Sequence, residues 1–298
     1  MQPPEPELAG RRGFARRQQP EEFASFVGQS HASQRVRPGF GAGYVTGPRY
    51  TRTMNVLTPQ ENPDAPTRVV CFPNAGSGAA SFRAFAPLLA PHAELVIVRL
   101  PGREARIAEP PHRKLAELVP AVAEELADTL DVGERRLVFF GHSMGALVAF
   151  ELARHLRRTA RRLPDRLIVS GRPAPHVPYP PGYEFVHDLP WERLVERLRG
   201  YSGTPEALLA DPELLEMFLP TLRADFEVVE TYRYSPQPPL PCGIAAYGGL
   251  TDDEVPSATL AAWADHTSGP FRLRLFDGGH FYLDGQRGEV AKAVLTDM

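Results

Sequence analysis

The chain has 298 residues, which is long enough to bury a substantial core and fits one large domain. Hydrophobic residues make up 43% and charged residues 23%, a globular composition, and a formal net charge of −3 argues against a nucleic-acid partner. No apolar run approaches the roughly 18 residues that cross a bilayer, and the first residues lack the apolar core of a signal peptide. We therefore expect a cytoplasmic protein with no membrane partner.

Residues 1–50 differ from the rest in composition. They are rich in proline, arginine, glutamine and glycine and poor in large apolar side chains, which is typical of a disordered segment. Their seven Arg and four Glu give a local charge of +3, so a basic docking arm is an alternative to a disordered extension. We expect residues 51–298 to form the folded domain.

Short apolar runs then alternate with helical patterns. The expected strands are 67–72, 94–100, 137–140, 165–171, 243–247 and 271–276. The expected helices between and after them are 81–89, 115–130, 146–153 and 286–297. This alternation predicts an α/β fold with a mostly parallel, twisted sheet and helices on both faces. Cys71 and Cys242 lie within strands, where we expect small buried side chains rather than a disulfide.

One long segment interrupts the alternation. About seventy residues without a strand pattern separate Gly171 from Gly243. Helical patterns cover 189–198, 205–209 and 212–232, and the last begins with an N-cap aspartate, a proline at the first helical position and an early glutamate. Because insertions of this length are usually functional, we expect a helical lid over about 175–238.

Ser143 stands in the motif Gly-His-Ser-Met-Gly between the strand 137–140 and a helix-forming series. Strand, G-x-S-x-G and helix are the context of a nucleophile elbow, a sharp turn that exposes the serine hydroxyl above the sheet. Gly141 and Gly145 would remove side chains where the strand and the helix nearly touch. The alternative is a glycine-rich turn of an ordinary α/β protein, because this short motif also arises by chance.

A nucleophilic serine needs a base, and the base needs an orienting acid. Of the nine histidines, His280 alone directly follows a core strand, so it is the expected base. His142 precedes Ser143 and is expected to pack or to orient the loop.

The acid should follow another strand. The strand through Tyr247 leads into a turn that contains Asp252, Asp253 and Glu254, and all three are candidates. The alternative for this turn is a solvated acidic loop. The order Ser, Asp, His along the chain is that of α/β-hydrolases.

An oxyanion hole needs two N–H donors. We expect one from Met144, directly after the nucleophile, and one from the loop around Asn74 and Ala75. That loop could also be an ordinary glycine turn or a phosphate cradle, although the chain has no G-x-x-x-x-G-K-[ST] motif.

Over roughly residues 66–298 these motifs resemble the type II thioesterases of polyketide and nonribosomal peptide assembly lines, which are stand-alone α/β-hydrolases. The matching segments are 72–76, 100–111, 141–145, 249–255 and 278–281, with 203–206, 220–225 and 232–234 in the insertion. The family pattern G-x-x-D-x-x-V places the acid on Asp252, and the family loop places the second donor on Ala75. The chain departs from the family at Asn74, where His is usual, and at Gly76-Ser77, where a Gly-Gly pair is usual.

The resemblance implies hydrolysis of acyl thioesters from the phosphopantetheine arm of acyl or peptidyl carrier proteins, which removes stalled or wrongly primed groups. Ser143, Asp252 and His280 would form the triad, and no cofactor or metal would be needed. We expect a monomer. The carrier protein would dock near the lid and Arg103 or Arg106, unless these arginines are structural ion-pair partners.

Three other functions remain open at this stage: a small-molecule esterase or acyltransferase, a terminal cyclising thioesterase domain, and a non-catalytic binding scaffold. The arginines of 154–162 are interpreted as a solvated helix end. Apolar residues of the insertion could line a pocket or form its core; these are Leu208, Leu215, Met217, Phe218 and Phe226.

Overall fold

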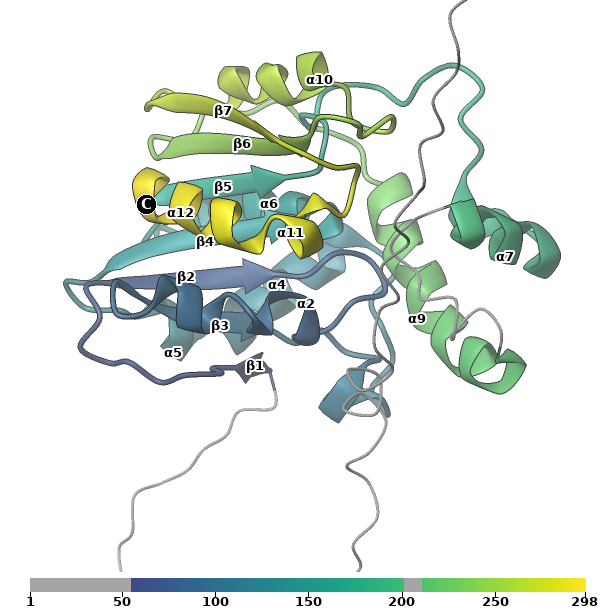
Figure 1. Ribbon diagram of the computed structural model, residues 1–298, viewed down its shortest axis with the longest axis horizontal. Helices are drawn as coiled ribbons and strands as arrows, with labels where there is room; N and C mark the ends of the chain where they lie inside the picture. The colour runs from purple at the N-terminus through teal and green to yellow at the C-terminus, as the bar shows by residue number, and fades with distance from the viewer. Residues whose placement is uncertain (1–54, 201–210) are drawn as a thin grey trace, which may run out of the picture. The chain divides into compact units, whose positions relative to one another are not determined.

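The computed structural model describes residues 55–200 and 211–298. Its centre is a seven-stranded sheet in the order β1-β3-β2-β4-β5-β6-β7, in which all neighbours are parallel except the short antiparallel β1 (Figure 1). The strands are β1 Val56–Leu57, β2 Thr67–Phe72, β3 Ala93–Val98, β4 Arg136–His142, β5 Arg166–Ser170, β6 Gly243–Gly249 and β7 Phe271–Phe276. The predicted α/β class and all six expected strands are confirmed.

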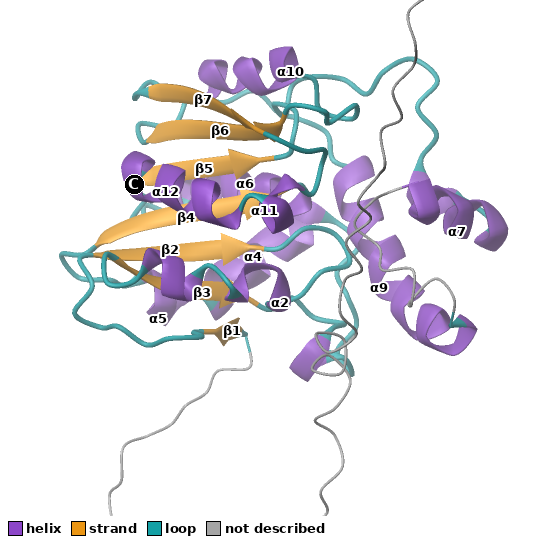
Figure 2. Cartoon of the chain, viewed as in Figure 1, coloured by secondary structure: helices purple, strands orange, loops and turns teal. Residues whose placement is uncertain are grey.

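Helices cover both faces of the sheet (Figure 2). One face packs against α4 Leu115–Glu125, α5 Ala127–Leu130, α6 Met144–Arg158 and α10 Ser257–Ala261. The other packs against α2 Ala80–Arg83, α3 Ala86–Leu89, α11 Tyr282–Gly285 and α12 Arg287–Asp297. Residues 55–200 and 211–298 also contain three 3₁₀ turns, η2 Glu104–Arg106, η3 Val186–Asp188 and η4 Ala262–His266.

The strands alternate their side chains between these two layers. In β2, Val70 and Phe72 join the α6 side, whereas Val69 and Cys71 join the α12 side. A strand buried on both faces needs apolar residues at every position, which explains its continuous apolar run. Cys71 and Cys242 are both buried and free, as predicted.

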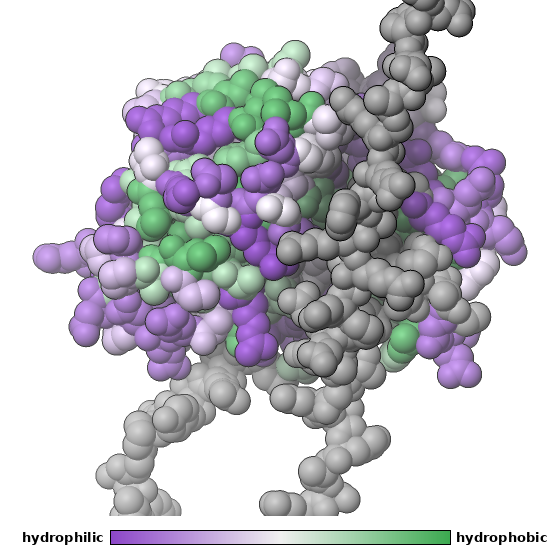
Figure 3. Space-filling model, viewed as in Figure 1, coloured by the Kyte–Doolittle hydropathy of each residue, from purple (hydrophilic) through white to green (hydrophobic). Residues whose placement is uncertain are grey.

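β7 is an edge strand and is only partly covered. Leu273 and Leu275 are exposed on it, and Figure 3 shows hydrophobic surface around β7 at the top of the view. Arg272 and Arg274 alternate with these leucines and bond to the carboxylate of Asp297 at the end of α12 (2.7–2.8 Å). Charged side chains on an edge strand discourage pairing with another chain.

The helical insertion, residues 171–242 between β5 and β6, carries α7 Trp191–Gly200 and α9 Pro212–Glu230. The predicted start of α9 is confirmed, since Asp211 Oδ1 accepts the N–H groups of Glu213 (3.0 Å) and Leu214 (3.1 Å). Pro220 lies inside α9. At its C-terminal end the buried carboxylate of Glu230 accepts the N–H groups of Val186 (2.8 Å) and His187 (3.0 Å), which ties η3 to the helix.

The insertion has its own apolar core. Leu215 is buried there with Leu194 and Leu198 of α7, and Phe218 and Phe226 pack against the same cluster. Met217 is exposed. Of the two roles considered for these apolar residues, pocket lining and insertion core, the structure supports the core role for Leu215. Leu208 and the expected helix 205–209 lie outside the described residues.

Two expected helices are divided. The segment 81–89 forms α2 and α3, because Pro87 has no N–H to continue the helical ladder of the first. The segment 115–130 forms α4 and α5, with Leu126 outside the helical region at φ −95° and ψ 6°. Residues 1–50, expected to be disordered, lie outside the described part of the chain. Among the residues described, no helix has the length and apolar character needed to cross a bilayer.

Candidate active site

Ser143 lies on a sharp turn between β4 and α6. Its φ of 52° and ψ of −114° are unusual for a residue with a side chain and indicate a strained backbone. The N–H of Ser143 donates to the carbonyl of Ser170 on the neighbouring strand β5 (2.7 Å). The half-buried side chain makes no capping bond to α6, so the hydroxyl is not used to hold the helix. This is the geometry expected of a nucleophile elbow.

The two glycines of the motif stand where the backbone is most crowded. A Cβ at Gly141 would lie 2.2 Å from the carbonyl oxygen of Gly145, and a Cβ at Gly145 would lie 1.8 Å from the carbonyl oxygen of Phe72. Real Cβ atoms do not approach backbone so closely. The predicted reason, close contact of the nucleophile strand with the following helix, is confirmed for Gly141, whereas Gly145 is needed for the contact of α6 with the end of β2.

A Gly145→Ala substitution is expected to destabilise the protein by about 3 kcal/mol or more, because the new methyl group meets rigid backbone of β2 and not a side chain that can move. The free energy of unfolding from denaturant titration measures this loss. Gly288→Ala is the control, since nothing lies within 4 Å of a Cβ there and Gly288 is in α12. That control should be neutral or slightly stabilising. Equal stabilities for the two variants would contradict the crowding argument.

Asp252 and His280 meet at the ends of β6 and β7. A hydrogen bond of 2.8 Å joins His280 Nδ1 and Asp252 Oδ2. The other oxygen, Oδ1, accepts the N–H groups of Glu254 (3.1 Å) and Val255 (3.2 Å). The Asp252 side chain is 1% exposed and that of His280 is 14% exposed. The carboxylate is therefore fixed in position, while the ring keeps an exposed edge.

The loops that carry this pair are in direct contact. The N–H of Thr251 donates to the carbonyl of Gly278 (3.0 Å). A Cβ at Gly249 would lie 2.3 Å from the carbonyl oxygen of Gly279, so glycine is needed there for the loops to approach. Asp253 is exposed. Of the three carboxylates left open by the sequence in this turn, the structure brings that of Asp252 to the histidine.

The two expected oxyanion donors come from adjoining segments. Met144 is the first residue of α6, where N–H groups have no partner within the helix. Ala75 lies in the loop after β2, and the carbonyl oxygens of Phe72 and Pro73 in this region lie 1.8 and 2.7 Å from a Cβ placed on Gly145. The start of this loop thus packs against the first turn of α6, and the partial positive charge of that helix end favours a developing anion.

His142 is buried behind the site, in agreement with its predicted packing role. Its Nδ1 is 2.9 Å from Ser170 Oγ, which in turn is 2.5 Å from the hydroxyl of Tyr282. The His142 and His280 rings are 5.2 Å apart. Burial, and then the charge of nearby His280, hold the pKa of His142 well below its usual value. A neutral ring at this position does not oppose a positive charge on His280. Ser170 and Tyr282 do not belong to any recognised motif, and the sequence analysis therefore did not identify them.

Arg103 and Arg106 are not a docking surface. Arg103 is 7% exposed and forms a bidentate pair with Asp225 of α9 (2.7 Å for both bonds). Arg106 is 4% exposed and binds Glu109 and Glu125 (2.6–2.9 Å). Of the two roles left open for these arginines, carrier docking and structural ion pairing, the structure supports ion pairing, because both guanidinium groups are already paired inside the protein.

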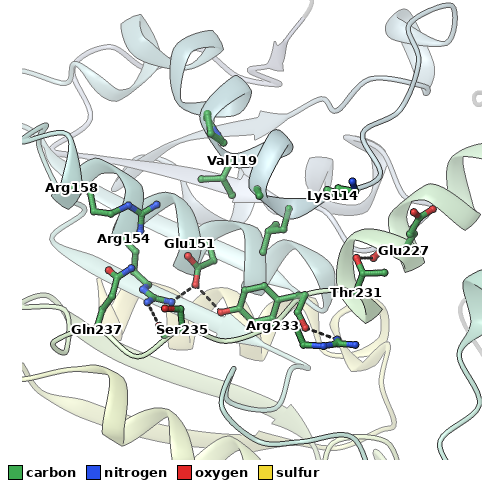
Figure 4. Close-up of a pocket in the computed structure, with 14 residues that line it drawn as sticks. Lys114, Val119, Glu151, Arg154, Arg158, Glu227, Thr231, Arg233, Ser235 and Gln237 are labelled. Atoms are coloured by element: carbon green, nitrogen blue, oxygen red, sulfur yellow. Dashed lines mark hydrogen bonds and ion pairs between the residues drawn. The ribbon is translucent and has the colours of Figure 1, made fainter.

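Arg154 is also not part of a solvated helix end. It is buried, binds Glu151 and the carbonyl of Ser235, and lies over the ring of Tyr234. Tyr232 donates to the same Glu151 carboxylate (2.8 Å). Figure 4 shows the side chains of Glu151 and Arg154 pointing toward one another. Arg154, Glu151 and Tyr232 line a cavity of about 500 Å³ between α4, α6 and the end of α9, and none of the five predicted site residues lines it.

Comparison with known proteins places the site in a family. Residues 67–298 match the family described as the thioesterase domain. The chain belongs to the thioesterase family. The gramicidin S biosynthesis protein GrsT of Aneurinibacillus migulanus is 40% identical over 237 residues, which are 80% of this chain and 91% of that protein. Thioesterase PikA5 of Streptomyces venezuelae is 41% identical over 232 residues, 78% of this chain and 81% of that one.

A solved structure gives the same result. The type II thioesterase BorB from the borrelidin biosynthetic cluster is 38% identical, with a TM-score of 0.73 over 82% of this chain and 97% of its own. The resemblance to type II thioesterases drawn from the motifs is confirmed, and this thioesterase is an enzyme of the α/β-hydrolase fold. The elbow, the acid–histidine pair and the loop that carries Ala75 all lie within the matched residues.

Proposed function

We propose that this thioesterase hydrolyses acyl thioesters from the phosphopantetheine arm of acyl or peptidyl carrier proteins and so removes stalled or aberrant groups from a biosynthetic assembly line. The observation that carries the proposal is the Asp252–His280 hydrogen bond within a thioesterase domain. The His280 ring lies 5.2 Å from that of His142, which directly precedes the elbow serine, and the hydroxyl of this serine does not cap α6. The names of the relatives point to biosynthesis of gramicidin S and borrelidin, which supports the choice of carrier-bound substrates.

In the proposed reaction, His280 takes the proton of the Ser143 hydroxyl as its oxygen attacks the thioester carbonyl. The carbonyl oxygen becomes an anion that accepts the N–H groups of Met144 and Ala75. The C–S bond then breaks, and the pantetheine sulfur leaves with the proton from His280. Asp252 holds the ring in the required tautomer and stabilises the imidazolium.

Water completes the proposed cycle. His280 removes a proton from a water molecule, whose oxygen attacks the acyl carbon of the Ser143 ester, and the same donors hold the second oxyanion. Collapse releases the carboxylic acid and returns the proton to Ser143. Each step uses only acid–base and nucleophilic groups of this chain. All three proposed triad residues belong to one copy of it, which supports a monomer as the active unit.

The helical insertion is the proposed lid. Its α9 packs against the loop after β2, since a Cβ at Gly76 would lie 2.7 Å from the side chain of Leu222. That loop carries the proposed donor Ala75. An acyl chain bound at Ser143 would therefore lie beneath the insertion, where the partly buried Phe218 and Phe226 are apolar side chains that it could contact.

Steady-state hydrolysis of acetyl-, propionyl- and longer acyl-carrier proteins, compared with the matching free pantetheine thioesters and oxygen esters, tests the function. We expect kcat/KM for the carrier-bound thioesters to exceed that for the free ones by at least about tenfold, because remote binding energy contributes only when the carrier is present. Equal turnover of free oxygen esters would favour a small-molecule esterase. Transfer of the acyl group to an added alcohol or amine instead of water would favour an acyltransferase.

A further inference from the structure

One carboxylate of the helical insertion reaches the proposed oxyanion loop. Asp225 of α9 is buried, and its Oδ2 accepts the N–H of Gly76 at 2.7 Å. Gly76 directly follows Ala75, the proposed second oxyanion donor. The same carboxylate receives both terminal nitrogens of Arg103. A buried bidentate pair of this kind is strong and directional because two parallel bonds fix its orientation.

Arg103 extends the contact along the loop. Its Nη1 also donates to the carbonyl of Ser77 (3.0 Å), one residue beyond the peptide that Asp225 binds. Its Nε lies 3.4 Å from the carbonyl of Pro101, in the segment after β3. The pair therefore joins three separate parts of the chain: the loop after β2, the loop after β3 and α9.

The peptide group between Ala75 and Gly76 is held at both of its polar ends. Its N–H binds Asp225, and its carbonyl oxygen accepts the side-chain amide of Asn74 at 3.2 Å. Because a peptide group is planar, fixing both ends fixes the orientation of the whole unit. This unit adjoins the N–H of Ala75. Asn74 is also where the chain departs from the usual family sequence, so its amide has a defined role here.

Packing leaves α9 little freedom to shift at this point. Gly76 has a φ of +70°, and a Cβ there would lie 2.7 Å from Leu222 and 2.8 Å from Phe218. One turn before Asp225, the hydroxyl of Thr221 donates to the carbonyl of Gly102 (2.7 Å). The Asp225 carboxylate is thus held against the loop by a helix, α9, that is itself bound to the rest of the domain.

We propose that Asp225 and Arg103 are positioning residues of the hydrolytic reaction: together they set the Ala75 N–H for the oxyanion. This rests on the proposed function of Ser143 and Ala75. Neither side chain touches the reacting atoms. Their effect should therefore be confined to the stabilisation of the tetrahedral state, with little effect on binding of the thioester itself.

The test compares two conservative substitutions of buried arginines. Arg103→Lys keeps the charge but cannot form the bidentate pair and reach Ser77 together. Arg106→Lys is the matched control, since Arg106 is equally buried and bidentate but binds Glu109 and Glu125, away from the loop. With an acyl-pantetheine substrate, we expect Arg103→Lys to lower kcat by about tenfold or more, with KM changed less than about twofold. Arg106→Lys should keep kcat.

Asp225→Asn provides a second variant, expected to change kcat in the same direction. A third readout separates positioning from general loosening of the structure. A trifluoromethyl ketone forms a tetrahedral adduct with the serine and needs the oxyanion donors, whereas a thioether analogue of the substrate does not. Arg103→Lys should weaken binding of the ketone about as much as it lowers kcat and leave binding of the thioether unchanged.

Three outcomes would overturn the inference: an unchanged kcat in folded Arg103→Lys, an equal loss in Arg106→Lys, or equal weakening of both inhibitors. If Asp225→Asn does not fold, Arg103→Lys alone decides. Wild-type protein separates this result from failure of the proposed function. If the wild-type protein hydrolyses no thioester, the proposed function is wrong. The positioning role is then still measured by the rate at which a fluorophosphonate modifies Ser143 in the two lysine variants.

Discussion

Replacing Ser143 by alanine is expected to lower thioester hydrolysis by about 10⁴-fold or more, because no other group at the elbow can form the acyl-enzyme. The fold should persist. The side chain of Ser143 does not cap α6, and the bond from its backbone N–H to Ser170 is unaffected by the substitution. The measurement is kcat/KM on an acyl-pantetheine, with the melting temperature as the check on folding.

Ser257→Ala is the control for this experiment. Ser257 is an exposed serine at the start of α10, far along the chain from the elbow, and its loss should leave both activity and stability unchanged. A Ser143→Ala protein that kept its hydrolytic rate would remove the serine from the mechanism and with it the proposed acyl-enzyme.

Asp252→Asn is expected to lower kcat by about 10³- to 10⁴-fold. The reason lies in how the carboxylate is held. Oδ1 accepts two backbone N–H groups, so an asparagine would keep its oxygen there and turn its NH₂ toward His280. His280 Nδ1 would then have to accept, which places the ring proton on Nε2. In that tautomer the ring cannot take the proton of Ser143.

The neighbouring Asp253 makes the comparison sharp. It is exposed, so Asp253→Asn should change kcat by less than about twofold, with the same change in net charge. Steady-state rates of the two variants on one substrate give the answer. If Asp253→Asn lost more activity than Asp252→Asn, the acid would move by one residue along the chain.

The elements that position the nucleophile could be read from sequence because their requirements are local. The apolar run of β4, the two glycines and the first turn of α6 are consecutive, and the glycines permit close contacts of this segment, Gly141 with the first turn of α6 and Gly145 with the end of β2. His280 could be predicted from the sequence for a similar reason, since it directly follows a strand. The choice between Asp252 and Asp253 could not be made from the turn alone, where neighbouring carboxylates look alike and only the backbone decides which one faces inward.

Contacts between segments that are far apart in the sequence leave no local sequence pattern from which they could be predicted. Arg103 and Asp225 are 122 positions apart. From sequence alone, an arginine in a polar loop is predicted to be exposed, because its buried partner cannot be identified. Arg154 was misread for the same reason: its burial depends on the chain around Ser235, not on its arginine-rich neighbours. The division of helix 81–89 was foreseeable, because Pro87 stands inside the pattern.

Pro220 divides α9 into two parts with different attachments. A proline has no N–H, so the ladder lacks one bond at this point and bending there is easier than elsewhere in the helix. The part after it is anchored through Thr221, Asp225 and Glu230, whereas Leu215 in the part before it packs with α7. Changes nearer the start of α9 than Phe218, which itself packs on Gly76, should therefore alter which acyl lengths are accepted while the rate of the chemical step is preserved. In this fold, the preference for acyl-chain length can therefore change without a change in the rate of the chemical step.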